Sequence, residues 1–197
     1  MQLLDDIKTR ECRAFALAWQ DWRGAELVPT RADVRIAEIV KLLPYVSVLE
    51  IISPEVANFR LFGTTLCDAL GVDLTGLNYF DMTEPEKRDL RIQRTCQIST
   101  HPCGSHFLHA IAYKSGRAVP NEVLSLPVWP NDPSMGRQSF AISIAMEDMR
   151  MVGTAAEPNR LPVSESFQFV DIGAGVPDAG LNLADRPPAT LNIERRN

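Results

Sequence analysis

Three stretches with strong β-strand character lie close together in the second half of the chain, at residues 105–113, 118–128 and 139–146. A Ser-Gly turn separates the first two, and a loop rich in Pro, Asn, Asp and Gly separates the last two. Connections this short join antiparallel strands, because parallel neighbours need a crossover of a dozen or more residues. The second half of the chain therefore predicts an antiparallel sheet.

The last of these stretches alternates between two kinds of side chain. Large apolar residues occupy one face (Phe140, Ile142, Ile144 and Met146), and small residues occupy the other. A period of two residues is typical of a β-strand, whose successive side chains point to opposite faces. We expect the large face, with Phe140 and Ile142, to line a cavity between the sheet and its helices.

The first half of the chain supplies two more strands. Residues 46–52 are β-branched and apolar, which favours a buried strand. A Ser-Pro-Glu turn leads into a second strand at 59–62, so the two predict a hairpin. A short apolar helix at 66–70 and a Gly-Val-Asp-Leu-Thr-Gly turn follow. Together these elements predict an α+β fold, with a five-stranded antiparallel sheet covered on one face by helices.

A longer helix is predicted from about residue 85 to residue 98, because Pro85 lies between two glutamates that suit a first helical turn. The expected inward positions are Leu90, Ile92, Thr95 and Cys96. The densest basic residues lie in this helix beside Glu84, Glu86 and Asp89, so we find no basic patch.

Residues 3–22 show the spacing of an amphipathic helix, with Phe15, Trp19 and Trp22 on one stripe and Gly24 as the terminator. This stripe either packs on the core of its own chain or forms a dimer contact. We therefore divide the chain into a helical cap or dimerisation segment (1–28), a central domain (29–150) and a C-terminal extension expected to be partly disordered (151–197).

The composition narrows the class of protein. The net charge is −5 over 197 residues, which does not favour a nucleic-acid binder. The N-terminus lacks the pattern of a secretory signal, and no apolar run is long enough to span a membrane. The four cysteines show no CxxC spacing and are expected to be reduced thiols. We expect a cytoplasmic protein.

Several short motifs, in order, resemble a known family. They are Phe15 to Trp22 with Gly24; Pro29, Arg31 and Asp33; Leu42-Leu43-Pro44 with Val46; Phe59-Arg60-Leu61-Phe62-Gly63-Thr64; Gly71, Asp73, Thr75 and Gly76; Pro102; and Leu126-Pro127. Over residues 12–146 the chain resembles PAS domains, and in particular a bacterial, mainly alphaproteobacterial, branch of PAS-like proteins of unknown function.

The resemblance implies a stand-alone sensory or adaptor protein that binds a small ligand between sheet and helices and signals to a protein partner. It also implies a homodimer paired through the N-terminal helix. A ligand would act by shifting the population between two arrangements of helix and sheet. The expected ligand-binding residues are Arg60, Phe62, Leu66, Leu70, Phe80, Ile92, His109, Phe140 and Ile142. For Arg60, a structural ion pair is the alternative to a ligand contact.

Other chemistries stay open as alternatives. The stretch from Cys96 to His109 holds all three histidines and two cysteines, which are metal and haem ligand types, but His106 and His109 should point to opposite faces of a strand. An enzyme would need His109 beside a carboxylate. The surroundings of Cys67 do not match a flavin photosensor motif, so this thiol is expected to be structural. No catalytic motif is found, and the sequence predicts neither a catalytic residue nor a specific cofactor.

Overall fold

The computed structural model describes residues 6–150, 152–164, 166–177 and 189–190 of the chain. Its centre is a seven-stranded sheet with the strand order β2-β1-β5-β4-β3-β6-β7. The strands are β1 (Val46–Ser53), β2 (Val56–Phe62), β3 (Gly104–Ala112), β4 (Ala118–Val128), β5 (Arg137–Ala145), β6 (Gln168–Asp171) and β7 (Ala189–Thr190). All pairs are antiparallel except β6 with β7. The five predicted strands are confirmed, and the sheet extends beyond them.

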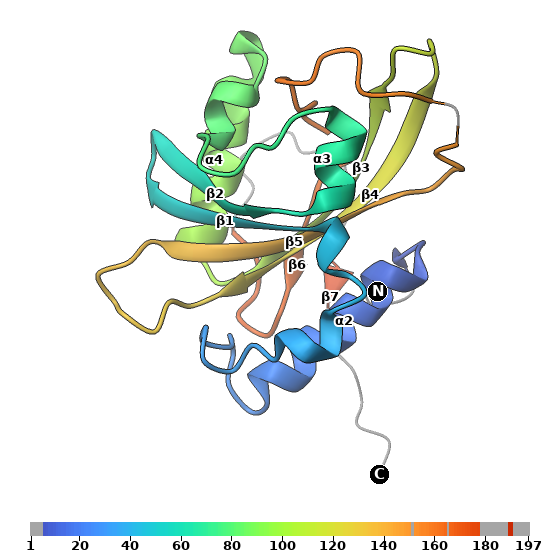
Figure 1. Ribbon diagram of the computed structural model, residues 1–197. Coiled ribbons are helices and arrows are strands. Elements are labelled where there is room, and N and C mark those ends of the chain that lie inside the picture. The colour runs from blue at the N-terminus through green and yellow to red at the C-terminus, as the bar shows by residue number, and fades with distance from the viewer. Residues whose placement is uncertain (1–5, 151, 165, 178–188, 191–197) are drawn as a thin grey trace.

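Helices lie on both sides of this sheet (Figure 1). The α-helices are α2 (Arg10–Arg23), α3 (Thr64–Leu70) and α4 (Arg88–Thr100), and the 3₁₀ turns are η1 (Ile36–Ile39), η2 (Leu43–Tyr45), η3 (Tyr79–Met82) and η4 (Pro85–Lys87). Figure 1 shows α3 and α4 on one side and α2 on the other, so two layers of side chains pack against the sheet. Within the described residues, no helix has the length and apolar character needed to cross a bilayer.

The helix α2 is shorter than the helix predicted over residues 3–22. It begins at Arg10, because Thr9 is its N-cap and accepts a hydrogen bond from the amide of Cys12 at 3.3 Å. The amides of Lys8 and Thr9 bind a carboxylate of β4 instead of a preceding helical turn. Gly24, with φ of +56°, follows the last residue and confirms the predicted terminator. Residues 3–5 lie outside the described part of the chain.

The aromatic stripe of α2 packs on the sheet of its own chain. Phe15, Trp19 and Trp22 are buried in one cluster with side chains of β1, β4 and β5. The indole Nε1 of Trp19 donates a hydrogen bond to the carbonyl of Pro127 at 2.8 Å. This packing confirms the cap interpretation of the stripe, whereas the dimer contact stays a prediction.

A buried carboxylate fixes the start of α2 to the sheet. Glu122 of β4 is 0% exposed and accepts four hydrogen bonds at 2.7–2.8 Å. The donors are the amide of Lys8, the amide and hydroxyl of Thr9, and Nε2 of His106 on β3. The other ring nitrogen of His106 contacts the side-chain amide of Gln168 on β6 at 3.1 Å. Three strands and the helix cap therefore meet at one carboxylate.

The C-terminal extension contributes to the sheet and to the helical side. Residues 168–171 form β6, which pairs with β3. Residues 161–164 form a strap, held to β3 where the hydroxyls of Ser164 and Ser166 donate to the carbonyl of Leu108. The predicted weak order of the tail concerns mainly residues 178–188 and 191–197, which lie outside the described residues.

A glycine at the start of α3 is required by a close backbone approach. Gly63 has φ of −61°, which any residue adopts, yet a Cβ there would lie 2.3 Å from the carbonyl oxygen of Pro44. We expect Gly63→Ala to lower the free energy of unfolding by about 1–3 kcal/mol, because backbone must move to admit the methyl group. Urea denaturation measures this loss. A gain in stability, the usual result for Ala at a compatible φ with free space, would contradict it.

Candidate functional site

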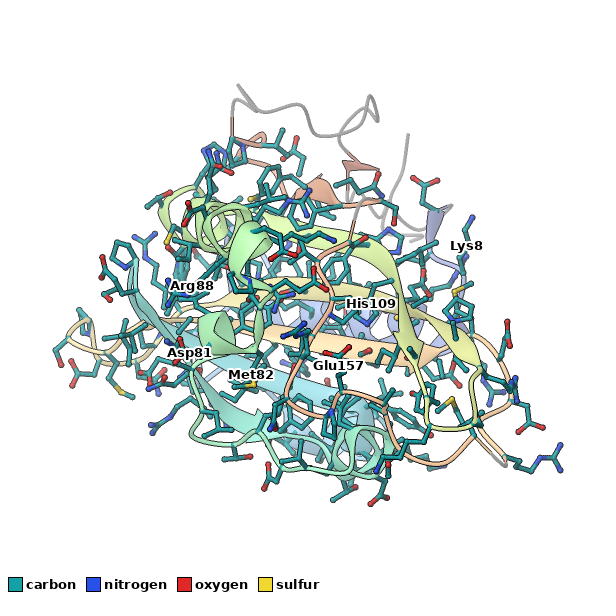
Figure 2. The ribbon with its side chains drawn as sticks, turned by 90° about the horizontal axis from the view of Figure 1, so that it is seen from above. Lys8, Asp81, Met82, Arg88, His109 and Glu157 are labelled. Atoms are coloured by element: carbon teal, nitrogen blue, oxygen red, sulfur yellow. The ribbon has the colours of Figure 1, made fainter. Side chains whose placement is uncertain are left out.

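A cavity of about 160 Å³ lies between the sheet and the α3–α4 layer. Its floor comes from β1, β3, β4 and β5, and its walls come from β2, α3, α4 and the strap at 161–164. Figure 2 looks down on this side of the sheet and shows His109 near its middle. A cavity therefore lies between the sheet and its helices, where the sequence predicted one.

The part of the cavity floor that β5 supplies is made of small side chains. The strand β5 presents Ser139, Ala141 and Ser143 to the cavity, not its large residues. The hydroxyls of Ser125 and Ser139 hydrogen-bond to each other across β4 and β5. Small side chains leave the space that a ligand would need, so the small-residue face of β5 is the one that shapes the cavity.

The predicted cavity positions of Phe140 and Ile142 are wrong. Both are buried on the opposite face of the sheet, in the cluster that contains Trp19 of α2. The alternation on β5 is as predicted, but it does not say which face meets which layer, because both faces of this sheet are covered. The large residues fill the interface with α2.

Three of the apolar residues predicted to bind a ligand do lie at the cavity. Phe62 of β2 and Leu66 and Leu70 of α3 all line its wall. Phe80 and Ile92 do not, which corrects the prediction for these two. They pack instead in a separate cluster with Ile51 and Ala57. The buried face of α4 differs from the predicted one, because it contains Arg91, Arg94, Thr95 and Ile98 and not Leu90 or Ile92.

Arg60 does not reach the cavity. It lies on β2 beside Glu50 of β1, with Nε 3.5 Å from a carboxylate oxygen, and its side chain is largely exposed. The ion-pair alternative is therefore the one the structure shows. Only the arginine of this pair is exposed to solvent, because the side chain of Glu50 is buried.

Two arginines that were not among the predicted ligand-binding residues line the cavity. Arg91 and Arg94 of α4 are buried and share an inward stripe with Thr95 and Ile98. The sequence did carry a signal for this position. Neither arginine has an acidic residue three or four positions away along the helix, so neither has the usual partner of an exposed helical arginine.

Both arginines bind the strap and stack on aromatic rings. Arg91 donates through Nη2 to the carbonyls of Leu161 at 2.7 Å and Pro162 at 2.9 Å, and its guanidinium lies 4.4 Å from the ring centre of Tyr79. Arg94 donates through Nη1 to the carbonyl of Ser164 at 2.7 Å. Arginine thus joins α4 to the strap over the cavity.

His109 faces the cavity from β3, as predicted. Burial, together with the positive charge of Arg91, lowers the pKa of His109 to about 4. The imidazole is therefore neutral near pH 7, with one donor and one acceptor nitrogen. Neither ring nitrogen has a hydrogen-bond partner among the described residues. His109 offers both groups to a molecule in the cavity.

The acid–base pair of the enzyme alternative is not formed by His109. No carboxylate is among the described residues that line the cavity, and the histidine that does pair with one is His106, on the other face. The opposite orientations of His106 and His109 confirm the prediction from strand parity.

The stretch from Cys96 to His109 does not gather into a cluster. Among the residues that the structure places, no three His, Cys, Asp or Glu side chains come together as metal ligands would. Cys103 is fully buried in an apolar cluster, and burial raises the pKa of its thiol to about 12. Cys67 lies on α3, where burial likewise raises the pKa of its thiol. Neither thiol has the lowered pKa of a reactive cysteine.

The chain is similar to a known protein family and to several solved structures. A family model described as "PAS domain" matches residues 7–138, more than half of the chain. No curated protein matches the chain.

Three solved structures resemble part of the chain. A fungal LOV domain photoreceptor is 18% identical, with a TM-score of 0.38 over 51% of this chain and 73% of that one. A LOV protein from Rhodobacter sphaeroides is 9% identical, with a TM-score of 0.40 over 53% and 60%. The PAS domain of an HTR-like protein from Haloarcula marismortui is 18% identical, with a TM-score of 0.36 over 59% and 98%.

Proposed function

Because the chain belongs to the PAS domain family, whose members are typically sensory, we propose that it is a sensor that binds a small molecule in the cavity above the sheet. The observation that carries this proposal is the row of small side chains that β5 presents to the cavity. Ser139, Ala141 and Ser143 keep a space of about 160 Å³ open where larger residues would fill the core. A core built for stability alone is packed to high density.

The signal would leave the cavity through the sheet. Asn121 of β4 lines the cavity, and its neighbour Glu122 holds the start of α2 on the opposite face. A ligand that prefers one position of β4 would therefore change how firmly α2 is held, by shifting the population of two arrangements. The surface of α2 and its connection to the sheet is then where a protein partner would read the signal. This proposal makes the chain a sensor or adaptor in the cytoplasm, not an enzyme, and includes a homodimer.

The test identifies the bound molecule and then reduces the space in the cavity by one substitution on its floor. Purified protein is denatured, and the small molecules it releases are identified by mass spectrometry. Ala141→Leu places a larger side chain on the floor and is expected to lower the affinity for the released molecule by at least about tenfold. The matched control is Ala110→Leu, at an exposed position of β3 outside the cavity lining. Equal binding by both variants would place the ligand elsewhere.

A further inference from the structure

Two positive charges face the cavity from α4. Arg91 is 4% exposed and Arg94 is 7% exposed, and both are cavity-lining residues. They lie three residues apart, so they project from the same face of the helix. Burial lowers the pKa of Arg94.

The bonds to the strap leave part of each guanidinium unused. Nη1 of Arg91 and Nε of Arg94 are buried and have no hydrogen-bond partner among the described residues. Carbonyl oxygens of the strap satisfy other donors on the same groups, but a carbonyl carries no net charge. The hydrogen bonds are thus partly satisfied, while the charges are not neutralised.

No acidic side chain balances these charges within the part of the chain that the structure describes. None of the residues lining the cavity there is Asp or Glu. None of the ion pairs found there includes Arg91 or Arg94. A buried charge without a counter-charge is costly, so buried arginines are normally paired. A water molecule would fill the free hydrogen-bond positions but would not supply the missing negative charge.

We propose that the cavity binds a small organic carboxylate, whose carboxylate group is held by Arg91 and Arg94 and whose apolar body lies against the strands. The proposal rests on the cavity being the ligand site of the sensor, and it adds the chemical class of the ligand. A guanidinium matches a carboxylate through two parallel N–H donors, which gives both charge and direction. The neutral imidazole of His109 can bind a further polar group of the same molecule.

The size and lining of the cavity limit the body of this ligand. A dry cavity of about 150 Å³ lined by apolar residues holds one benzene molecule, and the present cavity measures about 160 Å³. Leu49 and Val123 on its floor and Phe59 in its wall give it an apolar lining. The body is therefore about one aromatic ring or a short aliphatic chain. Benzoate, phenylacetate and hexanoate are suitable probes, and their primary amides are neutral analogues of nearly the same shape.

The test measures binding of each acid and each amide to the full chain near pH 7, by calorimetry and by the shift in melting temperature. We expect at least one acid to bind about 10- to 100-fold more tightly than its own amide, because hydrogen bonds to charged groups are the stronger ones. Arg91→Met and Arg94→Met should each remove most of this preference of the protein for the acid over its own amide. Arg88→Met is the matched control, because Arg88 lies on α4 but pairs at the surface with Asp81.

Glu165 provides a second control. It follows Ser164 in the sequence and lies outside the described residues, so its carboxylate is tested directly by Glu165→Gln. Acid binding by wild type that survives in this variant supports the proposal. Acid binding that appears only in the Glu165→Gln variant would mean that the chain's own carboxylate occupies the arginines, and would overturn it.

The remaining outcomes separate the two proposals. Equal affinity for acids and amides would overturn the carboxylate assignment and leave the cavity as the ligand site. No binding by any acid or amide, together with no small molecule released from the purified protein, would overturn both.

Discussion

Replacing Glu122 with alanine is expected to lower the free energy of unfolding by about 3–5 kcal/mol, because several buried donors lose their acceptor at about 1–3 kcal/mol each. The carboxylate is fully buried and accepts from the amides of Lys8 and Thr9, the hydroxyl of Thr9 and the ring of His106. Its removal leaves these donors unsatisfied where water cannot replace it. Urea denaturation followed by circular dichroism measures the loss.

The same carboxylate gives the protein an acid-sensitive stability. Burial alone would raise the pKa of Glu122, but the hydrogen bonds from His106, Lys8 and Thr9 outweigh it and lower the pKa to about 2. A carboxyl whose pKa is lower in the folded state stabilises the fold above its ordinary pKa. That contribution, about 3 kcal/mol, is lost as the pH falls from about 5 to about 2.

Two variants check this interpretation of Glu122. Glu122→Gln cannot be titrated, so the stability difference between wild type and this variant should shrink steadily between about pH 5 and pH 2. Glu147→Gln is the surface control, because Glu147 pairs with Arg117 where both side chains are about half exposed, and it should cost less than about 1 kcal/mol. A loss below about 1 kcal/mol for Glu122→Ala near pH 7 would contradict the anchoring role.

Replacing Trp19 with alanine is expected to cost about 3–5 kcal/mol, the range for truncating a buried aromatic residue. Its ring is 0% exposed between α2 and the sheet, and its Nε1 donates to the carbonyl of Pro127. The variant therefore loses apolar contacts and leaves a buried carbonyl without its donor. Thermal and urea denaturation should show the loss. The oligomeric state of the variant should equal that of the wild type.

Leu17 is the control on the same helix, because its side chain is about 43% exposed. Leu17→Ala should change stability by less than about 1 kcal/mol, since little apolar surface is uncovered. If Trp19→Ala changed the oligomeric state in size-exclusion chromatography without changing monomer stability, the packing of this stripe on its own sheet would be refuted.

Local sequence was enough to predict the five central strands and the antiparallel pairing of strands that follow one another, but not the pairing of β1 with β5. β4 and β5 have strong strand character and the connections between neighbours are short, so neither depends on distant contacts. Gly24 and the hairpin turn between β1 and β2 were predicted for the same reason. The extension beyond residue 150 was harder, because β6 pairs with β3, which lies far away in the sequence.

The cavity was predicted only in part, and the errors on β5 and on α4 have different causes. On β5, the sequence separated large from small residues but not the face that meets α2 from the face that meets the cavity. On α4, Leu90 and Ile92 were expected inside, whereas the buried positions include Arg91 and Arg94. An apolar pattern predicts burial by hydrophobicity, and it fails where a buried position carries a charge.

The sequence by itself determined which residues form strands and helices and which side chains share a face, because these follow from local backbone preference and periodicity. Only the tertiary structure decided which face lies under α2 and which forms the floor of the cavity, because both are covered and neither is marked by contact with water. It alone brought Arg91, Arg94 and His109 to one cavity and Glu122 to the cap of α2. Those positions depend on contacts between residues that are distant in the chain.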